Sequence, residues 1–176
     1  AALKLASSRI VDFELLEHVN DRAEQVKTVY LSTGGSTIEE IQRAVECLGA
    51  IEHLSLLHCV SQYPTDDENV NLRAIPTIQA EFPDLRIGYS DHSRGIEACL
   101  AAVALGAEVL EKHFTYHTRL PGDDHEGALT PETLRQLVAQ VTRLEVMLGS
   151  DEKGPVADEQ KALEHLRGKL LEVDFD

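Results

Sequence analysis

Residues 86–114, RIGYSDHSRGIEACLAAVALGAEVLEKHF, decide the fold class. The two ends of this stretch, 86–91 and 108–114, are short runs of β-type residues. Between them, the alanine-rich segment 95–105 predicts a helix, and Gly106 is typical of the position just after a helix. A strand, a helix and a second strand in this order indicate a parallel βαβ unit.

Three more β-type runs precede this unit, at 3–7, 29–33 and 54–59, and a helical pattern follows each of them. Ser36 and Glu39 predict a capping box for a helix that ends near Gly49. Thr130 followed by Pro131 predicts a later helix that ends near Gly149. Each of these helices has one apolar face, so we expect each to lie on the sheet. A charged helix is expected over 157–171.

Five βα units are too few to close a barrel, which needs eight strands. An open five-stranded sheet is therefore the alternative fold. Polar side chains end each run, and they are Ser7, Ser32, Thr33, His58, Cys59, Ser90, Asp91, His92, Glu111, Lys112 and His113. This pattern predicts a site at the C-terminal ends of parallel strands, as on the top face of a barrel. The crevice of an open α/β sheet has the same property.

Charge and composition exclude several classes of partner. The net charge of −15 disfavours nucleic acid or an acidic membrane surface. No apolar run approaches the ~20 residues of a membrane helix, and residues 1–8 do not resemble a signal peptide. Three widely spaced cysteines indicate a reducing, cytoplasmic location. We expect part of a barrel over 1–150, then a linker and helical tail over 151–176.

Six motifs in series carry a resemblance to a known family. They are KLAS at 4–7, LSTG at 31–34, LHCVSQYP at 57–64, GYSDH at 88–92, EKHFT at 111–115 and PGDD at 121–124. The series resembles the sialic acid synthase family, which includes N-acetylneuraminate, legionaminate and pseudaminate synthases and spore-coat sugar enzymes. The resemblance implies a TIM-type (β/α)8 barrel in which the five runs are strands 4 to 8. The first three units and the family's C-terminal antifreeze-like domain are not in this sequence.

The resemblance also implies a reaction. Carbon 3 of phosphoenolpyruvate attacks the aldehyde carbon of an open-chain N-acyl amino sugar of the N-acetylmannosamine type. Water attacks carbon 2, and phosphate leaves by cleavage of the C–O bond, which gives a nine-carbon 2-keto acid. The site must therefore hold a phosphate, polarise an aldehyde and move protons.

Residues carried over from the motifs fill these three tasks. His92 and His113 end neighbouring strands and are the expected metal ligands, for Mn²⁺ or, less naturally, Mg²⁺. Glu111, on the same strand face as His113, is the expected catalytic carboxylate. The expected phosphoenolpyruvate contacts are Lys4, Ser7, Ser32, Ser61 and Ser90. Tyr63 and Asp124 resemble the sugar contacts of the family.

Four further residues have other expected roles. Asp91 alternates away from His92 and is expected to support the strand end. Cys59 is expected to be a small apolar filler. His58 is equally compatible with a packed core residue and with a ligand contact. Arg9 stands where the family has an acid, which favours either a different sugar or a departure from sialic acid chemistry.

Two alternatives to a sialic acid-type synthase remain at this point. One is another phosphoenolpyruvate-dependent enzyme of the same barrel superfamily with a different aldose. The other is a catalytically inactive half-barrel that binds or oligomerises, because exposed strand edges and helix faces favour association. The resemblance implies a homodimer for the full-length protein, and we expect little activity from these 176 residues alone.

Overall fold

The computed structural model describes residues 1–122 and 124–171 and contains one parallel sheet. Its strands follow the chain in the order β1 (Ala2–Leu5), β2 (Thr28–Ser32), β3 (His53–Cys59), β4 (Arg86–Asp91) and β5 (Val109–Lys112). Each strand pairs in parallel with the next one. The predicted α/β fold with parallel strands is confirmed.

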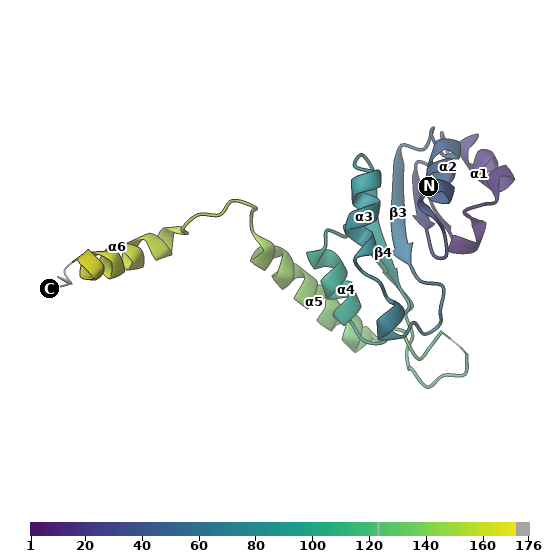
Figure 1. Ribbon diagram of the computed structural model, residues 1–176. Coiled ribbons are helices and arrows are strands. Elements are labelled where there is room, and N and C mark those ends of the chain that lie inside the picture. Colours follow the sequence, from purple (N-terminus) through teal and green to yellow (C-terminus); the bar gives the residue numbers. More distant parts are fainter. Residues whose placement is uncertain (123, 172–176) are drawn as a thin grey trace.

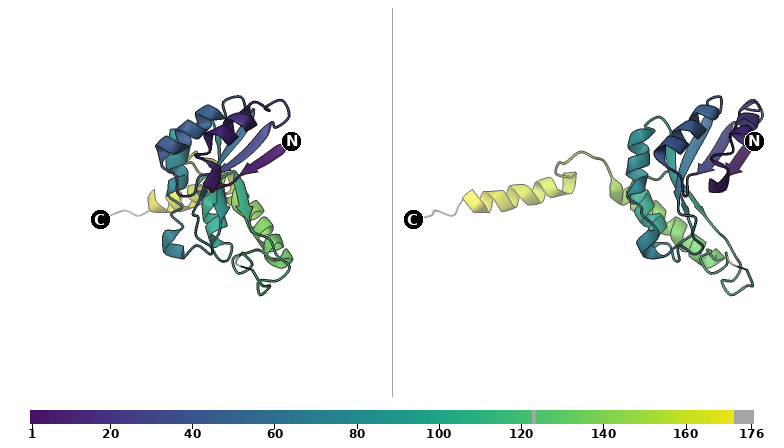
Figure 2. Two further views of the ribbon diagram at one scale, coloured as in Figure 1. Left: turned by 90° about the vertical axis from the view of Figure 1, so that its right-hand side faces the viewer. Right: turned by 45° about the vertical axis from the view of Figure 1, so that its right-hand side comes forward.

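Helices follow the strands, and most of them lie on the outer face of the sheet (Figure 1). They are η1 (Ser7–Arg9), α1 (Phe13–Asn20), α2 (Ile38–Cys47), η2 (Asp67–Asn69), α3 (Ala74–Glu81), α4 (Glu97–Ala104), α5 (Pro131–Leu148) and α6 (Ala157–Leu171). Figure 2 shows the sheet from two further sides, with α6 extending away from it. None of the helices within the described ranges is both long and apolar enough to cross a membrane.

The sheet is curled and not flat. In a flat sheet, four strand spacings of about 4.8 Å would separate β1 from β5 by about 19 Å. Here Lys4 Nζ on β1 lies 3.0 Å from Glu111 Oε1 on β5. The sheet is therefore a half-barrel of the TIM type, and the open-sheet alternative is wrong.

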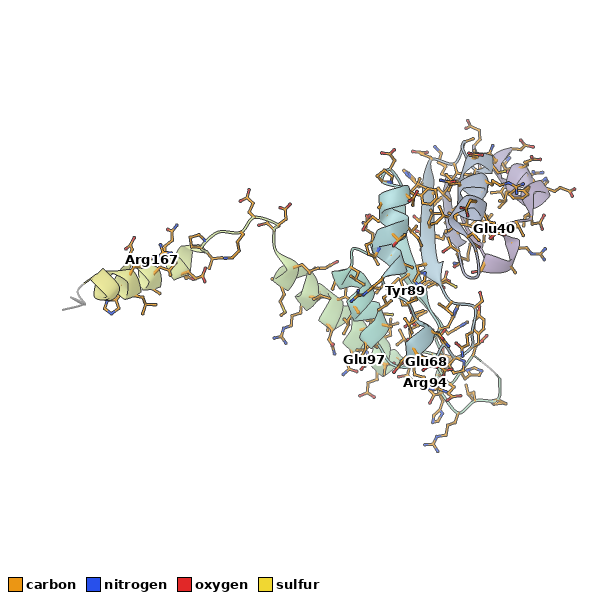
Figure 3. All side chains as sticks on the ribbon, in the orientation of Figure 1. Glu40, Glu68, Tyr89, Arg94, Glu97 and Arg167 are labelled. Atoms are coloured by element: carbon orange, nitrogen blue, oxygen red, sulfur yellow. The ribbon has the colours of Figure 1, made fainter. Side chains whose placement is uncertain are left out.

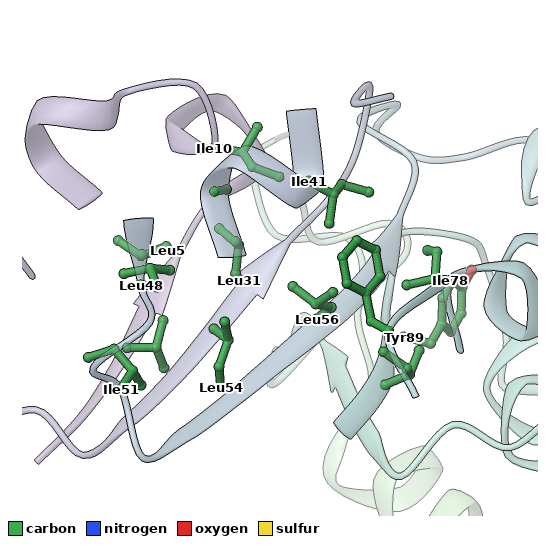
Figure 4. Close-up of a cluster of buried hydrophobic side chains, with 14 of the residues drawn as sticks. Leu5, Ile10, Leu31, Ile41, Leu48, Ile51, Leu54, Leu56, Ile78 and Tyr89 are labelled. Carbon is green, nitrogen blue, oxygen red and sulfur yellow. The ribbon is translucent and has the colours of Figure 1, made fainter. Parts of the chain in front are cut away.

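Alternation along the strands places one set of side chains outward, against the helices. Leu31, Leu56 and Ile87 are fully buried there, in a cluster that includes Ile41 and Leu48 of the α2 region (Figure 4). The other set of side chains faces the concave inner side. Apolar burial thus fixes which strand residues are presented to the inside of the barrel.

Several predicted boundaries need correction. The fifth strand is shorter than expected, because it ends at Lys112 and not at Phe114. The capping box of α2 is formed by Thr37 and Glu40, one residue later than predicted, since Thr37 has the extended backbone of an N-cap. The predicted start of α5 is confirmed, because Thr130 caps it and Pro131 occupies its first turn.

The expectation that the α5 apolar stripe lies on the sheet is wrong for most of its length. Leu137 is buried, and it packs with Ile96 and Cys99 near α4. Val138 and Met147 are 57% and 68% exposed. The stripe is therefore only partly covered by the part of the chain that the structure describes.

Candidate active site at the strand ends

Four of the predicted residues form one cluster on the concave face, the Lys4–Glu111 cluster, which consists of Lys4, Ser32, Ser90 and Glu111. Lys4 Nζ donates a hydrogen bond to Ser32 Oγ at 2.5 Å. Ser90 Oγ donates to Glu111 Oε1 at 2.8 Å, and the same carboxylate pairs with Lys4. The Ser90–Glu111 contact follows from the register, because these residues lie opposite each other on β4 and β5. The cluster thus joins residues from four strands around one lysine.

A second group surrounds Gly34, just after β2. Its backbone N–H donates to Ser7 Oγ at 2.9 Å. The side-chain tips of Ser7, Cys59 and Ser61 converge where a Cβ of residue 34 would stand. Hydroxyl groups and a backbone N–H gathered in one place can replace the hydration of a phosphate. Gly34 belongs to the motif LSTG at 31–34, but the motif alone indicates no role for it.

The expectation that Cys59 is only an apolar filler is wrong. Its side chain is buried, but Sγ lies 3.4 Å from Ser7 Oγ and 4.0 Å from His92 Nδ1. Burial raises the pKa of Cys59, whereas the contacts with His92 and Ser7 lower it more, so its pKa lies below the usual value. The thiol therefore belongs to the polar surroundings of His92.

His92 and His113, which we call the histidine pair, lie side by side at the ends of β4 and β5. Their ring centroids are 5.3 Å apart. His92 Nδ1 lies 2.9 Å from the Val60 carbonyl oxygen. If Nδ1 donates to this carbonyl, the neutral ring carries its lone pair on Nε2. Burial lowers the pKa of His92, but its contacts with Cys59 and Val60 outweigh burial and leave the pKa above the usual value.

His113 Nε2 is buried and has no hydrogen-bond partner within the described ranges. Among the described residues, the carboxylate oxygen nearest to it is Asp124 Oδ1, 3.9 Å away. Buried polar atoms normally have a partner, so this nitrogen suits a ligand that the protein does not supply. The two imidazoles could hold a divalent metal ion whose remaining ligands come from substrate and water. No group of three or more His, Cys, Asp or Glu side chains suited to a metal occurs among the described residues.

Tyr63 and Asp124, the predicted sugar contacts, lie beside the histidine pair. The Tyr63 ring is 4.2 Å from the His92 ring and 6.2 Å from the His113 ring, centroid to centroid. Half of the Tyr63 residue surface is exposed. The structure thus brings every predicted site residue to the same end of the sheet, although their roles stay predictions.

His58 is a packed residue. Its Nε2 lies 3.0 Å from the Val70 carbonyl oxygen, and its ring stacks on Tyr89 at 5.8 Å. Burial lowers the pKa of His58 more than its backbone hydrogen bonds raise it. Because His58 alternates with the inward-facing Cys59, it lies on the helix side of the sheet and away from the predicted site.

A half-barrel with polar groups gathered at the C-terminal ends of its strands defines a protein of the (β/α)-barrel class. The NeuB family model matches residues 1–153, and the chain belongs to this family. The chain is 42% identical over 172 residues to an uncharacterized protein of Methanocaldococcus jannaschii, over 97% of this chain and 50% of that protein. It is 38% identical to N,N'-diacetyllegionaminic acid synthase of Campylobacter jejuni, over 96% of this chain and 50% of that enzyme.

A solved structure agrees with this assignment. The N-acetylneuraminic acid (sialic acid) synthetase of Leptospira borgpetersenii, in complex with citrate, superposes with a TM-score of 0.85 at 40% identity. The match covers 98% of this chain and 59% of that one. The chain spans about half the length of the curated relatives it matches. Its relatives thus include synthases of sialic acid and related sugars.

Proposed function

We propose that this chain forms the phosphoenolpyruvate- and metal-binding side of a synthase that condenses phosphoenolpyruvate with an N-acyl amino sugar. The observation that supports it best is the Lys4–Glu111 cluster, in which one ammonium group lies among serine hydroxyls at the strand ends. This local donor set is suited to a phosphate despite the net charge of −15. The named synthases among the relatives favour the same reaction class.

In this proposal, the Glu111 carboxylate pairs with Lys4 in the ligand-free chain and is displaced by the phosphate of phosphoenolpyruvate. The incoming phosphate takes over Lys4 and the hydroxyls of Ser32 and Ser90, with Ser7, Ser61 and the Gly34 N–H as further donors. The displaced Glu111 carboxylate is then free to accept the proton of the water that adds to carbon 2. The new C–C bond forms from carbon 3 to the aldehyde carbon, whose oxygen takes up the proton that Glu111 removes from the water. The tetrahedral carbon 2 then becomes the ketone as its C–O bond to phosphate breaks, and the second water proton leaves with the phosphate.

The histidine pair is proposed to hold Mn²⁺, with Mg²⁺ as a weaker candidate. When bound, this ion supplies Lewis-acid polarisation of the aldehyde oxygen. Tyr63 and Asp124 border the pair and are proposed to orient the sugar. The buried Nε2 of His113, which lacks a partner in the described chain, supports this assignment.

A different acceptor sugar is the second candidate, and Arg9 favours it. Arg9 stands where the family has an acid, and it forms an ion pair of 3.2 Å with Asp12. Its side chain is 60% exposed, and Arg9 lies two residues after Ser7, which belongs to the group around Gly34. An acidic sugar would complement this charge.

The test of the proposal is binding of phosphoenolpyruvate and not turnover. Five strands leave the barrel open, so we expect little activity from this chain alone. We expect saturable binding in a calorimetric titration with Mn²⁺ present, weakened about ten-fold or more in Lys4→Met through loss of a charge-assisted phosphate contact. Lys27→Met is the matched control, since Lys27 forms an exposed ion pair with Glu52 near the N-terminal ends of β2 and β3. Equal affinity of the Lys4→Met variant and the unmodified chain would contradict the proposal.

A further inference from the structure

A buried ion pair lies behind the candidate site, on the outer face of the sheet. Lys112 Nζ is 2.6 Å from Asp91 Oδ2, and the two side chains are 3% and 0% exposed. They lie opposite each other in the ladder between β4 and β5. The pair therefore ties together the C-terminal ends of the two strands that precede the histidine pair.

Both oxygens of the Asp91 carboxylate accept more than one hydrogen bond. Oδ1 accepts hydrogen bonds from Tyr89 Oη at 3.0 Å, Ser93 N at 2.8 Å and Ser93 Oγ at 2.7 Å. Oδ2 also accepts a contact of 3.2 Å from Cys99 Sγ on α4. Figure 3 labels Tyr89 on β4, from where its hydroxyl reaches this carboxylate. So many short contacts leave Asp91 little freedom to move.

Lys112 also holds the backbone on the far side of His92. Its ammonium group donates to the Ser93 carbonyl oxygen at 2.6 Å. His92 thus stands between two residues, Asp91 and Ser93, that are both bonded to Lys112. His113 directly follows Lys112 in the chain, so one lysine fixes the backbone at both histidines.

We propose that the Asp91–Lys112 pair is a positioning device that sets the spacing and orientation of His92 and His113. This inference rests on the proposed function, because it assigns the pair to the metal site of that proposal. Alternation along the strand sends the two histidines inward while the pair stays outward. The pair therefore acts on the metal through the backbone and touches neither ion nor substrate.

Fold stability alone does not call for charges at this position. A buried ion pair can often be replaced by uncharged groups of similar volume without loss of stability, because burial of two charges carries a desolvation cost. The surroundings on α4 are apolar or weakly polar, with Cys99 and Ala102 fully buried. The charged pair instead fixes the relative orientation of the two strand ends, because its hydrogen bonds are short and directed at specific atoms.

The test compares metal binding in the unmodified chain and in a double variant, Asp91→Asn/Lys112→Met, that removes both charges and keeps the volume. We expect Mn²⁺ affinity, measured by calorimetry, to fall about ten-fold or more, as is typical when groups that orient metal ligands are lost. We also expect the visible absorption of bound Co²⁺ to change, because the coordination geometry changes. Urea unfolding of the metal-free chains is measured in parallel, and Lys27→Met is the control for loss of a lysine.

A folded double variant with unchanged Mn²⁺ affinity and unchanged Co²⁺ absorption would overturn the inference. If the double variant does not fold, Tyr89→Phe decides, because it removes only one hydrogen bond to Asp91. We expect a few-fold loss of Mn²⁺ affinity in this variant, and no loss would overturn the inference. Absence of Mn²⁺ binding by the unmodified chain is a distinct result, which removes the proposed metal site and the positioning role with it.

Discussion

At the scale of single residues, Gly34 shows how a missing side chain shapes the candidate site. A Cβ at this position would lie 2.6 Å from Ser61 Oγ, 2.8 Å from Ser7 Oγ and 2.9 Å from Cys59 Sγ. All three atoms are side-chain tips, which can move aside. Because residue 34 has no side chain, the two hydroxyls and the thiol can come together at this point.

Gly34→Ala is therefore expected to impair binding more than folding. The methyl group would push the two hydroxyls apart, and we expect phosphoenolpyruvate affinity to fall about ten-fold, equal to about 1.4 kcal/mol. The midpoint of thermal unfolding should change little, since no backbone atom is displaced. Calorimetry and circular dichroism on the same samples check both expectations. Unchanged affinity would show that the group around Gly34 does not contact the ligand.

His58 makes folding stability depend on pH. Its pKa in the folded chain lies below the usual 6.5, so the unfolded chain takes up the proton first as the pH falls. This residue's contribution to stability is complete above pH 6.5 and is lost as the pH falls from there toward the folded-state pKa. We expect the loss of thermal stability between pH 7.5 and 5.5 to be smaller in His58→Gln. His53→Gln, at the exposed start of β3, is the control, and an identical pH profile of His58→Gln and the unmodified chain would refute the assignment.

The sequence predicted the residues that belong to motifs, and it missed those whose role depends on contacts between strands. Lys4, Ser32 and Glu111 were named from their motifs, and the structure places them in contact. Asp91 was expected to support the strand end, but its pairing with Lys112 was missed, because the register between two strands is not a local property of the sequence. A signal was available, since both residues are charged, opposite in sign and outward-facing by alternation.

At the scale of elements, the contact between β4 and β5 depends on Gly88. A Cβ there would stand 2.5 Å from the Val109 carbonyl oxygen and 2.7 Å from the Val109 Cβ. Backbone atoms cannot move aside as side-chain tips can. The two strands that carry the histidine pair therefore approach each other only because residue 88 has no side chain.

Gly88→Ala is expected to destabilise the fold by about 1–3 kcal/mol, as is typical of overpacking in a core. Gly154→Ala is the matched control, because a Cβ at Gly154 would meet no atom within 4 Å. Urea unfolding of both variants checks this. Equal midpoints for the two variants would contradict the close approach of β4 and β5.

Local sequence patterns predicted which segments are helices and strands. They did not predict which elements bury the apolar face of each helix. Capping residues and glycines placed the helices to within a few residues, since these signals act within one turn. The covering of α5 was predicted wrongly, because an apolar stripe shows that a face is suited to burial but not which element buries it.

At the scale of the whole molecule, the described sheet has two edges, β1 and β5, and α5 has exposed apolar side chains. Unpaired strand edges and apolar surfaces favour association.

The curvature that brings Lys4 to Glu111 was expected only from the family resemblance, because alternation and composition also suit an open sheet. A homodimer stays a prediction.

We expect the apparent molecular mass in static light scattering to rise with protein concentration. Val138→Glu/Met147→Glu should reduce this rise, because both side chains are largely exposed on α5. Gln136→Glu adds charge at an exposed polar position of the same helix and is the control. A mass that is independent of concentration, or a rise that the double variant leaves unchanged, would refute association through α5.

The most direct test of the central claim is a calorimetric titration of Mn²⁺ into the unmodified chain and into His92→Ala/His113→Ala, with and without phosphoenolpyruvate. We predict saturable Mn²⁺ binding by the unmodified chain, tighter when phosphoenolpyruvate is present, and its loss in the double variant. Mn²⁺ binding of equal strength in both chains, or none in the unmodified chain, would contradict the claim that the strand ends form a metal-dependent phosphoenolpyruvate site.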